Sequence, residues 1–502
     1  MKKYDFIIIG TGMGGATLGY KLAKAGVKVL FLEKGISHIK SQKQIRGEFA
    51  ETLMFQKKSM NDYSSLHNTG RCTDLIYSNS DKKNFIPFIG KGGGGSSSLY
   101  GAVLEQFKPE DFNNELWPIS YSDLEPYYQQ AESMFEVSRN NLSLSPENIK
   151  AWDVLSNNGI HPYELPMALS RANSHLNHQC KDNCQSVLCN HYQKNDAEKI
   201  ALAPAIVNHQ ADLIDECEVL ELNWKNNKII SVKCIVKNQV TNYFADNFIL
   251  AAGAIFSPAL LLKSKNLANS SGLVGKYLMR HMVDLYSVFI KGSNVSINTQ
   301  KQIGFNDFYN INGEKFGNVQ SFGSLPPSEV ILNELIHKLP NFLHKPTEKI
   351  APFLNPFLGS IFKREFKDKL IFASIMEDEP SIENNISVDQ KSKKIIMNYK
   401  PSEKDTEKVK NFRQMVIKAF APLKVKLIES AFDNKRLAHV CGTLRFGNNP
   451  NKSVLNKNNR SHDIENLYVV DSSFFPTSGG INPSLTIAAN SLRVADKILE
   501  II

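Results

Sequence analysis

The sequence has 502 residues, of which 42% are hydrophobic and 22% are charged, and it carries a formal net charge of +9. These proportions are ordinary for a folded globular protein, and the length is sufficient for two or more domains with large buried cores. The lysines are scattered along the chain and no nucleic-acid-binding module is visible. We therefore expect no nucleic-acid partner.

No stretch approaches the ~18 apolar residues that a membrane-spanning helix needs, and the apolar run near residue 1 is too short for a signal peptide. The chain has 7 cysteines. Those that stand isolated in the sequence are Cys72, Cys217, Cys234 and Cys441. This usage is typical of a reducing compartment and not of a disulfide framework. We expect a cytoplasmic protein that is free, membrane-associated, or exported together with a partner.

The first residues predict a strand, a helix and a second strand. Residues 4–9 are a continuous apolar run, as expected for a strand that is buried on both faces. Residues 16–27 have apolar side chains at helical spacing, and residues 28–33 are a second apolar strand. This order is typical of the βαβ unit that binds nucleotides.

A glycine-rich turn joins the first strand to this helix. Its G-x-G-x-x-G pattern lets the backbone approach a pyrophosphate, which would lie at the positive end of the helix dipole. The residues that we expect around the phosphates are Gly10, Gly12, Met13, Gly14 and Gly15. Glu33, at the end of the second strand, is placed to bind ribose hydroxyls.

A second glycine-rich stretch, GKGGGGSSSLYGAVLEQF, occupies residues 90–107. Consecutive glycines and serines offer many backbone N–H groups and little bulk, so the backbone can run beside a pyrophosphate or a flat ring. A mobile surface loop is the alternative, but the apolar and aromatic neighbours favour a packed position. The contacts that we expect are Gly94, Gly95, Ser96 and Ser97. This second stretch favours FAD over NAD.

The later elements are of two kinds. Residues 218–250, 283–322 and 370–399 alternate and contain turn signals, which predicts antiparallel sheet. Residues 247–266 and 465–476 contain apolar strands, and residues 482–502 predict a closing amphipathic helix.

The predicted fold class is α/β, with a discontinuous Rossmann-like FAD-binding domain and an inserted antiparallel-sheet substrate domain. We place the first part of the FAD-binding domain at 1–285, with an insert at 105–200. The substrate domain then covers 286–433, and residues 434–502 complete the FAD-binding domain.

Several of these stretches, in this order, resemble the glucose–methanol–choline (GMC) oxidoreductases. They are residues 4–35, 90–112, 117–132, 272–281 and 439–496, together with ILAAGAIFSPALLL. The resemblance implies FAD and a hydride transfer from an alcohol carbon to flavin N5. It matches His439 to the histidine of the H-x-x-G-T motif, and Asn482 to the second active-site residue. It also places a further group of residues at the cofactor: Tyr100, Ala252, Gly253, Asp471, Ser472 and Pro483. From its position in the chain, we expect the Val219 backbone to contact the adenine side of the cofactor.

The two active-site residue types suit the chemistry that the resemblance implies. An imidazole has an ordinary pKa near 6.5, so His439 can accept the alcohol proton near neutral pH. The Asn482 amide can hold the alcohol oxygen by hydrogen bonding without acting as a second base. The alternatives are a core histidine with satisfied hydrogen bonds and an Asn–Pro turn residue.

Two departures from the family refine this expectation. Some relatives bind FAD covalently through a histidine in the second glycine-rich stretch, whereas this chain has Leu99 and Tyr100 there. We therefore expect non-covalent FAD. Photodecarboxylases of the family have a cysteine in place of the catalytic histidine, so His439 argues against that chemistry.

Three cysteines lie close together at Cys180, Cys184 and Cys189. Some bacterial relatives, such as the large subunits of membrane-linked sugar dehydrogenases, have a similar group that binds an iron–sulfur cluster. Three interpretations stay open: unligated thiols, a [3Fe–4S] cluster that passes electrons to a partner, and a zinc site that includes His178 and His191.

Residues 328–369 mix Leu, Ile and Phe with lysines and are interrupted by prolines. The simplest interpretation is an amphipathic helical pair that packs on its own domain. Peripheral contact with a membrane surface and a lid over the substrate are the alternatives.

The sequence as a whole predicts an FAD-dependent oxidoreductase that oxidises the CH–OH group of an alcohol, a sugar or a sterol-like substrate. We expect a dehydrogenase whose electrons pass to an acceptor subunit or a quinone. Two other classes remain open. One is a flavoprotein that catalyses a redox-neutral cyclisation or isomerisation, and the other is a flavin-binding partner protein without turnover.

Overall fold

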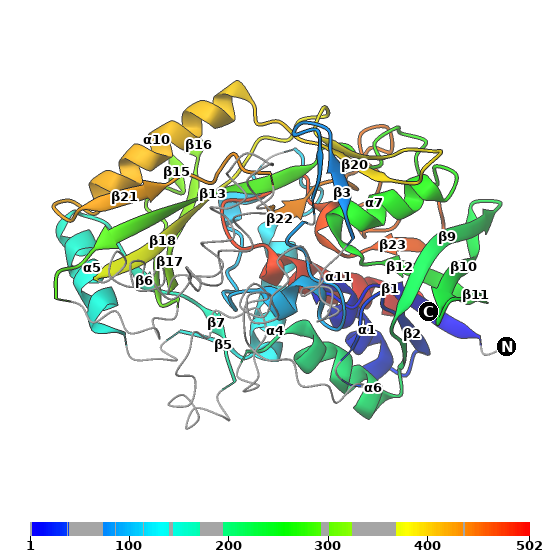
Figure 1. Cartoon of the computed structure of the whole chain (residues 1–502). Coiled ribbons are helices and arrows are strands. Elements are labelled where there is room, and N and C mark those ends of the chain that lie inside the picture. The colour runs from blue at the N-terminus through cyan, green and yellow to red at the C-terminus, as the bar shows by residue number, and fades with distance from the viewer. Residues whose placement is uncertain are drawn as a thin grey trace, which may run out of the picture.

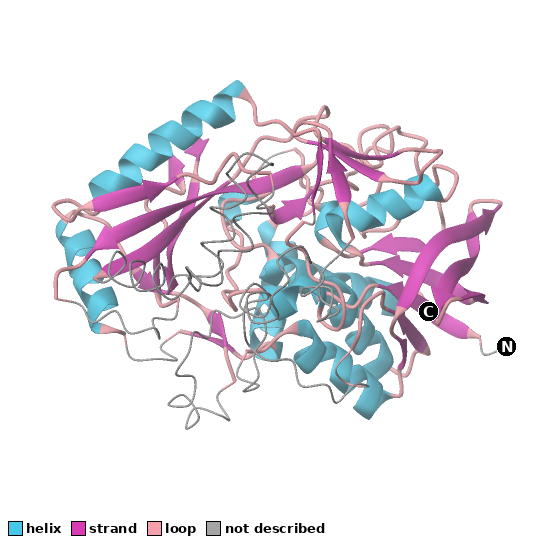
Figure 2. Ribbon diagram, viewed as in Figure 1, coloured by secondary structure: helices cyan, strands magenta, loops and turns pink. Residues whose placement is uncertain are grey.

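Two sheets of different kinds organise the molecule, one on each side of the view in Figures 1 and 2. The structure is a computed structural model, and it describes residues 3–37, 39, 74–85, 87–113, 115–139, 144–170, 194–292, 301–323, 368–434 and 437–502. The expected α/β fold class is confirmed, with a parallel sheet in one half and an antiparallel sheet in the other.

The parallel sheet gathers strands from both ends and the middle of the chain. Its order is β23 (Leu467–Val469), β12 (Ala245–Leu250), β1 (Tyr4–Ile9), β2 (Val29–Leu32) and β8 (Asp212–Ile214). The adjacent strands are parallel, so helices can cover both faces, and this explains the unbroken apolar runs. Ile7 and Ile8 of β1 are fully buried.

Four helices pack beside one another on this half of the molecule (Figure 1). They are α1 (Met13–Lys24), α4 (Tyr121–Met134), α6 (Ala203–His209) and α11 (Ser484–Leu499). Helix α7 (Gly253–Lys263) contacts β9 of an antiparallel meander instead. The meander consists of β9 (Cys217–Lys225), β10 (Lys228–Val236) and β11 (Gln239–Tyr243).

The antiparallel sheet forms the other half. Its order is β21 (Val425–Ile428), β13 (Met279–Phe289), β18 (Lys369–Met376), β17 (Gly317–Gly323), β14 (Ile303–Phe305) and β6 (Tyr163–Glu164), and β22 (Ala438–Cys441) also pairs with β13. Helices α5 (Pro146–Asn157) and α10 (Glu403–Ala419) share its core, where Tyr286 and Phe372 are fully buried. α5 and β6 lie within the predicted 105–200 insert and pack with this sheet.

Shorter elements complete the fold. A four-stranded sheet has the order β19 (Asn385–Val388), β20 (Ile395–Asn398), β3 (Ile76–Ser78) and β4 (Lys83–Phe85). Two small pairs are β5 (Val137–Ser138) with β7 (Met167–Ala168), and β15 (Asn310–Ile311) with β16 (Glu314–Lys315). The short helical turns are η1 (Gly95–Leu99), η2 (Pro109–Asp111), η4 (Glu198–Leu202) and η5 (Ser472–Phe474).

Two sequence expectations fall on residues outside the described ranges. They concern the cysteines at 180, 184 and 189, and the segment 328–369 apart from its last two residues. Within the described ranges, no helix has both the length and the apolar character needed to cross a membrane.

Candidate active site

The turn between β1 and α1 packs tightly, both on itself and against the residue that follows β23. A Cβ atom built on Gly14 would lie 2.0 Å from the Val470 carbonyl oxygen, and one built on Gly15 would lie 2.3 Å from the Gly10 carbonyl oxygen. Gly10 itself has φ +100°, in the region that favours glycine. These contacts place the start of α1 directly against the ends of β23 and β1.

Gly12 faces open space in this crowded turn. A Cβ atom built on Gly12 would meet no heavy atom within 4 Å, and α1 begins at the next residue, Met13. The N–H groups of the first helical turn and the helix dipole favour an anion here. A Cβ atom on Gly95 would lie 3.0 Å from the Gly12 Cα atom, so the second glycine-rich stretch lies against the first.

Glu33 connects the two glycine-rich stretches. Its Oε2 accepts hydrogen bonds from the Thr11 N–H (3.0 Å) and the Thr11 hydroxyl (2.7 Å). Its Oε1 accepts from the N–H groups of Gly35 and Gly92, both at 2.9 Å. The carboxylate that was predicted to bind ribose thus holds the two glycine-rich stretches together.

Val219 and Pro483 lie on the borders of this region. The Cys217 N–H donates to the Glu33 carbonyl oxygen at 2.9 Å, and Val219 follows Cys217 on β9. Pro483 immediately precedes α11, which packs against α1.

Asp471 connects the turn after β12 to the turn after β23. Its Oδ2 accepts from the Gly253 N–H (2.9 Å) and the Ser257 hydroxyl (2.5 Å), and its Oδ1 accepts from the Ser473 N–H (2.9 Å). The neighbouring Ala252 N–H donates to Ser257 Oγ at 3.1 Å. Burial raises the pKa of the Asp471 carboxyl group.

The serines of the second stretch are used to shape its backbone. Ser97 Oγ donates to the Gly94 carbonyl oxygen at 2.6 Å and accepts from the Ala197 N–H at 3.0 Å. Ser96 Oγ accepts from the Gly90 N–H at 3.1 Å. The Tyr100 hydroxyl donates to the Asn195 carbonyl oxygen.

His439 lies on β22 and is partly buried, with φ +57°. Its Nδ1 is 2.7 Å from Nδ1 of His281 on β13. Burial lowers the pKa of His439 well below its usual value, and the nearby His281 and Lys301 lower it further. The imidazole is therefore neutral at physiological pH.

The strand of His439 is joined to the nucleotide site through Ser472. The Ser472 hydroxyl donates to the Val440 carbonyl oxygen at 2.6 Å, and the Gly442 N–H donates to the Ser472 carbonyl oxygen at 3.2 Å. This contact connects β22, of the antiparallel half, to the turn after β23, of the parallel half.

Asn482 is 8% exposed, and its Oδ1 accepts from Gln320 Nε2 at 3.0 Å. Gln320, on β17, has a buried Oε1 without a hydrogen-bond partner among the described residues. Within the described residues Asn482 Nδ2 has no hydrogen-bond partner, so this donor and the Gln320 Oε1 acceptor remain for a ligand.

One loop, residues 477–482, connects the surroundings of both predicted catalytic residues. His281 Nε2 is 3.0 Å from the Ser478 carbonyl oxygen, and Asn482 ends the loop. Four residues of chain span at most about 14 Å. The structure thus brings the environments of His439 and Asn482 to the same short segment.

Buried carboxyl groups hold this loop. Glu377 Oε1 accepts from the Gly479 N–H (3.1 Å), and Asp378 Oδ1 accepts from the Ser478 hydroxyl (3.0 Å). Burial raises the pKa of Glu377 and of Asp378 to about 7. The Gly480 N–H donates to the Tyr309 hydroxyl at 3.1 Å.

Sequence reasoning missed His281, Gln320 and Lys301. His281 ends a stretch that carried the family resemblance, LMRH, and this was the one available signal. Gln320 and Lys301 stand in the divergent middle of the chain, where no motif marks them. Lys301 Nζ lies 4.8 Å from the centroid of the Phe322 ring, and desolvation lowers its pKa to about 8.

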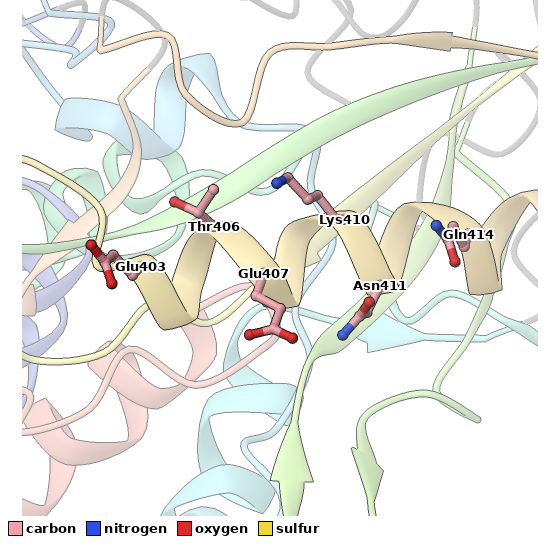
Figure 3. A pocket seen from close by; sticks show the side chains of 6 residues that line it. All are labelled: Glu403, Thr406, Glu407, Lys410, Asn411 and Gln414. Carbon is pink, nitrogen blue, oxygen red and sulfur yellow. The ribbon is translucent and has the colours of Figure 1, made fainter.

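Two hollows on the described surface lie elsewhere. The larger, of about 540 Å³, follows the outer face of α10 and is lined by Glu403, Thr406, Glu407, Lys410, Asn411 and Gln414 (Figure 3). The smaller, of about 310 Å³, includes Glu105, Arg139 and His161. Neither includes His439 or Asn482, and the first has only polar side chains along one helix, so we do not place the active site there.

Comparison with known protein families decides the class. Models of the GMC oxidoreductases match residues 4–283 and residues 380–491. The chain belongs to the GMC oxidoreductase family. It is therefore an oxidoreductase, and GMC oxidoreductases bind FAD.

Three curated GMC relatives match nearly the full chain. The 6'''-hydroxyparomomycin C oxidase of Streptomyces lividus is 24% identical over 99% of this chain and 91% of its own length. The 2-methyl-1,2-propanediol dehydrogenase of Mycolicibacterium austroafricanum is 25% identical over 98% and 95%. The fructose dehydrogenase large subunit of Gluconobacter japonicus is 25% identical over 99% and 98%.

Solved GMC-like structures share the fold. Pyridoxine 4-oxidase from Mesorbium loti superimposes with a TM-score of 0.67 at 16% identity, covering 99% of both chains. Formate oxidase from Aspergillus oryzae gives a TM-score of 0.67 at 16% identity, covering 99% of this chain and 98% of its own. Among the residues that the structure describes, no group of three or more His, Cys, Asp or Glu side chains could hold a metal ion.

Proposed function

We propose that this GMC oxidoreductase oxidises a CH–OH group by hydride transfer to non-covalently bound FAD, with His439 as the base. The observation that carries the proposal is the shared loop 477–482. The loop contacts His281, which contacts the neutral imidazole of His439. The same loop ends at Asn482, where hydrogen-bonding groups remain available.

The residues of the nucleotide site fit FAD. Open space beside Gly12, at the N-terminus of α1, suits the pyrophosphate, and the adjacent Gly95 brings more backbone N–H groups to the same point. Glu33 accepts four hydrogen bonds from the protein, two on each oxygen, and so supports the site by holding the two glycine-rich stretches together. When bound, FAD supplies the hydride acceptor.

His439 and Asn482 divide the remaining work. An alcohol has a pKa far above that of an imidazole, so its proton leaves only as the hydride leaves the carbon, and a neutral His439 must be in place to receive it. Asn482 would hold the alcohol oxygen and so orient the C–H bond. Holding the reacting groups in this geometry lowers the activation free energy of such reactions substantially.

The relatives support this substrate class. Their names describe an oxidase of 6'''-hydroxyparomomycin C and dehydrogenases of 2-methyl-1,2-propanediol and of fructose. We propose a dehydrogenase for this chain, with an electron-acceptor subunit or a quinone as the oxidant. The name of the fructose dehydrogenase relative, a large subunit, favours such an arrangement.

Anaerobic flavin reduction tests the proposal. The purified holoprotein is mixed without oxygen with a panel of primary alcohols, diols, sugars and hydroxysteroids, and the bleaching of the flavin absorbance near 450 nm (an approximate flavin band) is followed. We expect bleaching by at least one member, with the corresponding carbonyl compound as product. A redox-neutral product or no bleaching by any member would contradict it.

The variant His439→Ala gives the matched test of the base. We expect it to bind flavin as the wild type does and to reduce it about 100-fold or more slowly, because a positioned general base contributes about 10²–10⁴-fold. His462→Ala is the control, since His462 binds Ser453 away from this loop. An unchanged rate in His439→Ala would remove the base assignment.

A further inference from the structure

His281 stands between the base and the loop. It lies near the start of β13, is 1% exposed, and has a hydrogen-bond partner at each ring nitrogen. Nδ1 is 2.7 Å from His439 Nδ1, and Nε2 is 3.0 Å from the Ser478 carbonyl oxygen. The rings meet edge to face, with centroids 4.8 Å apart.

The Ser478 carbonyl oxygen decides where the His281 proton is. A carbonyl oxygen only accepts hydrogen bonds, so His281 Nε2 must carry the proton. Burial lowers the pKa of His281 to about 4, and the ring is therefore neutral and has one proton. Its Nδ1 is then a bare acceptor.

The tautomer of His439 follows from this acceptor. Two unprotonated nitrogens would repel each other at 2.7 Å, so the hydrogen bond requires a proton on His439 Nδ1. Because His439 is also neutral, its Nε2 has no proton. No described residue bonds Nε2, and this atom is not among the fully enclosed unpartnered atoms of the described chain.

We propose that His281 is a positioning residue that holds His439 as the Nδ1–H tautomer, so that the lone pair of Nε2 receives the substrate proton. The inference rests on the proposed function. In the step, the alcohol carbon loses a hydride to FAD, the alcohol O–H bond breaks, and its proton bonds to His439 Nε2. The product carbonyl forms, and Nδ1–H continues to donate to His281.

Removing the His281 acceptor has a defined consequence. Without it, His439 is free to carry its proton on Nε2, where the proton would point at the substrate and block acceptance. A protonated His281 would do the same, because its Nδ1–H would donate to His439 Nδ1 and move the His439 proton to Nε2. Burial prevents this protonation.

Two amide variants separate the two contacts of His281. In His281→Asn, the amide oxygen occupies the place of Nδ1 and can still accept from His439, but the Ser478 contact is lost. In His281→Gln, the longer amide reaches the place of Nε2 and keeps the Ser478 contact, but the acceptor at Nδ1 is lost. The two variants differ from each other in side-chain length by one methylene group.

The experiment compares anaerobic flavin reduction by both variants, using the alcohol that best bleaches the wild-type holoenzyme. We expect His281→Asn to stay within about threefold of wild type, and His281→Gln to fall about 100-fold in the rate constant with little change in the substrate concentration for half-maximal rate, as for a misplaced general base. Equal rates in the two variants, or a faster His281→Gln, would overturn the proposal.

A measurement of the tautomer in the wild-type protein tests the proposal even if the His281 variants do not fold. Wild-type holoenzyme labelled with ¹⁵N-histidine, with the His439 signals assigned by their loss in His439→Ala, shows which nitrogen carries the proton. We expect Nδ1–H for His439 and Nε2–H for His281, and the reverse for either ring would overturn the proposal. If none of the alcohols tested reduces the flavin of the wild-type protein, that result would instead contradict the proposed function and leave the tautomer result intact.

Discussion

The protonation of one side chain, His439, links the sequence to the chemistry. Burial, His281 and Lys301 all lower its pKa. Burial disfavours the charged imidazolium, and a nearby cation adds repulsion to the same state. A base that is neutral over the whole physiological range is available in every molecule, at the cost of a weaker affinity for the proton.

Lys301 makes this balance testable. In Lys301→Met the cation near His439 is lost, so the pKa of His439 rises and the acidic limb of the pH profile of kcat/KM moves to higher pH. Lys291→Met, which removes an exposed lysine, is the control and leaves the limb in place. A shift to lower pH in Lys301→Met would contradict the electrostatic argument.

At the scale of elements, the glycine-rich turns show which contacts belong to the fold and which to the ligand. Gly14 has no room for a Cβ atom because the β23 backbone is in the way, whereas Gly12 has room. The two glycines look equivalent in the sequence, but only Gly12 leaves space for a bound group.

Alanine at these positions separates the two roles. We expect Gly14→Ala to lower the free energy of unfolding by about 3 kcal/mol or more, because the new methyl group meets a carbonyl oxygen. Gly12→Ala should leave the Tm of the flavin-free protein within about 2 °C and weaken FAD binding at least about tenfold. Thermal unfolding with and without FAD measures both, and equal effects of the two substitutions would be inconsistent with this division.

At the scale of the molecule, the proposed active site lies where the two halves meet. His281 and Gln320 come from the antiparallel sheet, and Asn482 precedes the helix that packs on the parallel half. The loop between them is held by Glu377 and Asp378, whose raised pKa values tie its stability to pH.

The sign of this pH dependence is set by proton release on unfolding. In the unfolded chain Glu377 ionises near pH 4.5, whereas in the folded protein burial keeps it protonated to about pH 7. Between these values the folded state binds more protons, so the contribution of Glu377 to stability falls as pH rises. We expect the Tm of Glu377→Gln to gain on that of the wild type from pH 5 to pH 7 (rough working values).

Glu383→Gln is the control for this series, because Glu383 is exposed. Its Tm difference from wild type should stay constant over the same range. A Glu377→Gln protein that loses Tm relative to wild type as pH rises would show that Glu377 is ionised in the folded state.

The local pattern alone predicted a good part of the fold. The apolar run at 4–9, the glycine-rich turn and the closing helix appear as β1, the Gly10–Gly15 turn and α11 (Ser484–Leu499). Each depends on neighbours in the sequence, namely on strand burial, on backbone room at glycine and on helical spacing. The packing of α5 and β6 with the antiparallel sheet was not readable, since it depends on contacts with strands more than a hundred residues away.

By itself the sequence indicated the family and the type of cofactor, and it predicted the pair His439 and Asn482, because each of these predictions depends on a short motif of neighbouring residues. Only the tertiary structure brought His281 to His439 and Gln320 to Asn482. His281, His439 and Gln320 come from three different strands and Asn482 from a loop, and a hydrogen bond between such residues depends on sheet register and loop packing, which no local pattern encodes.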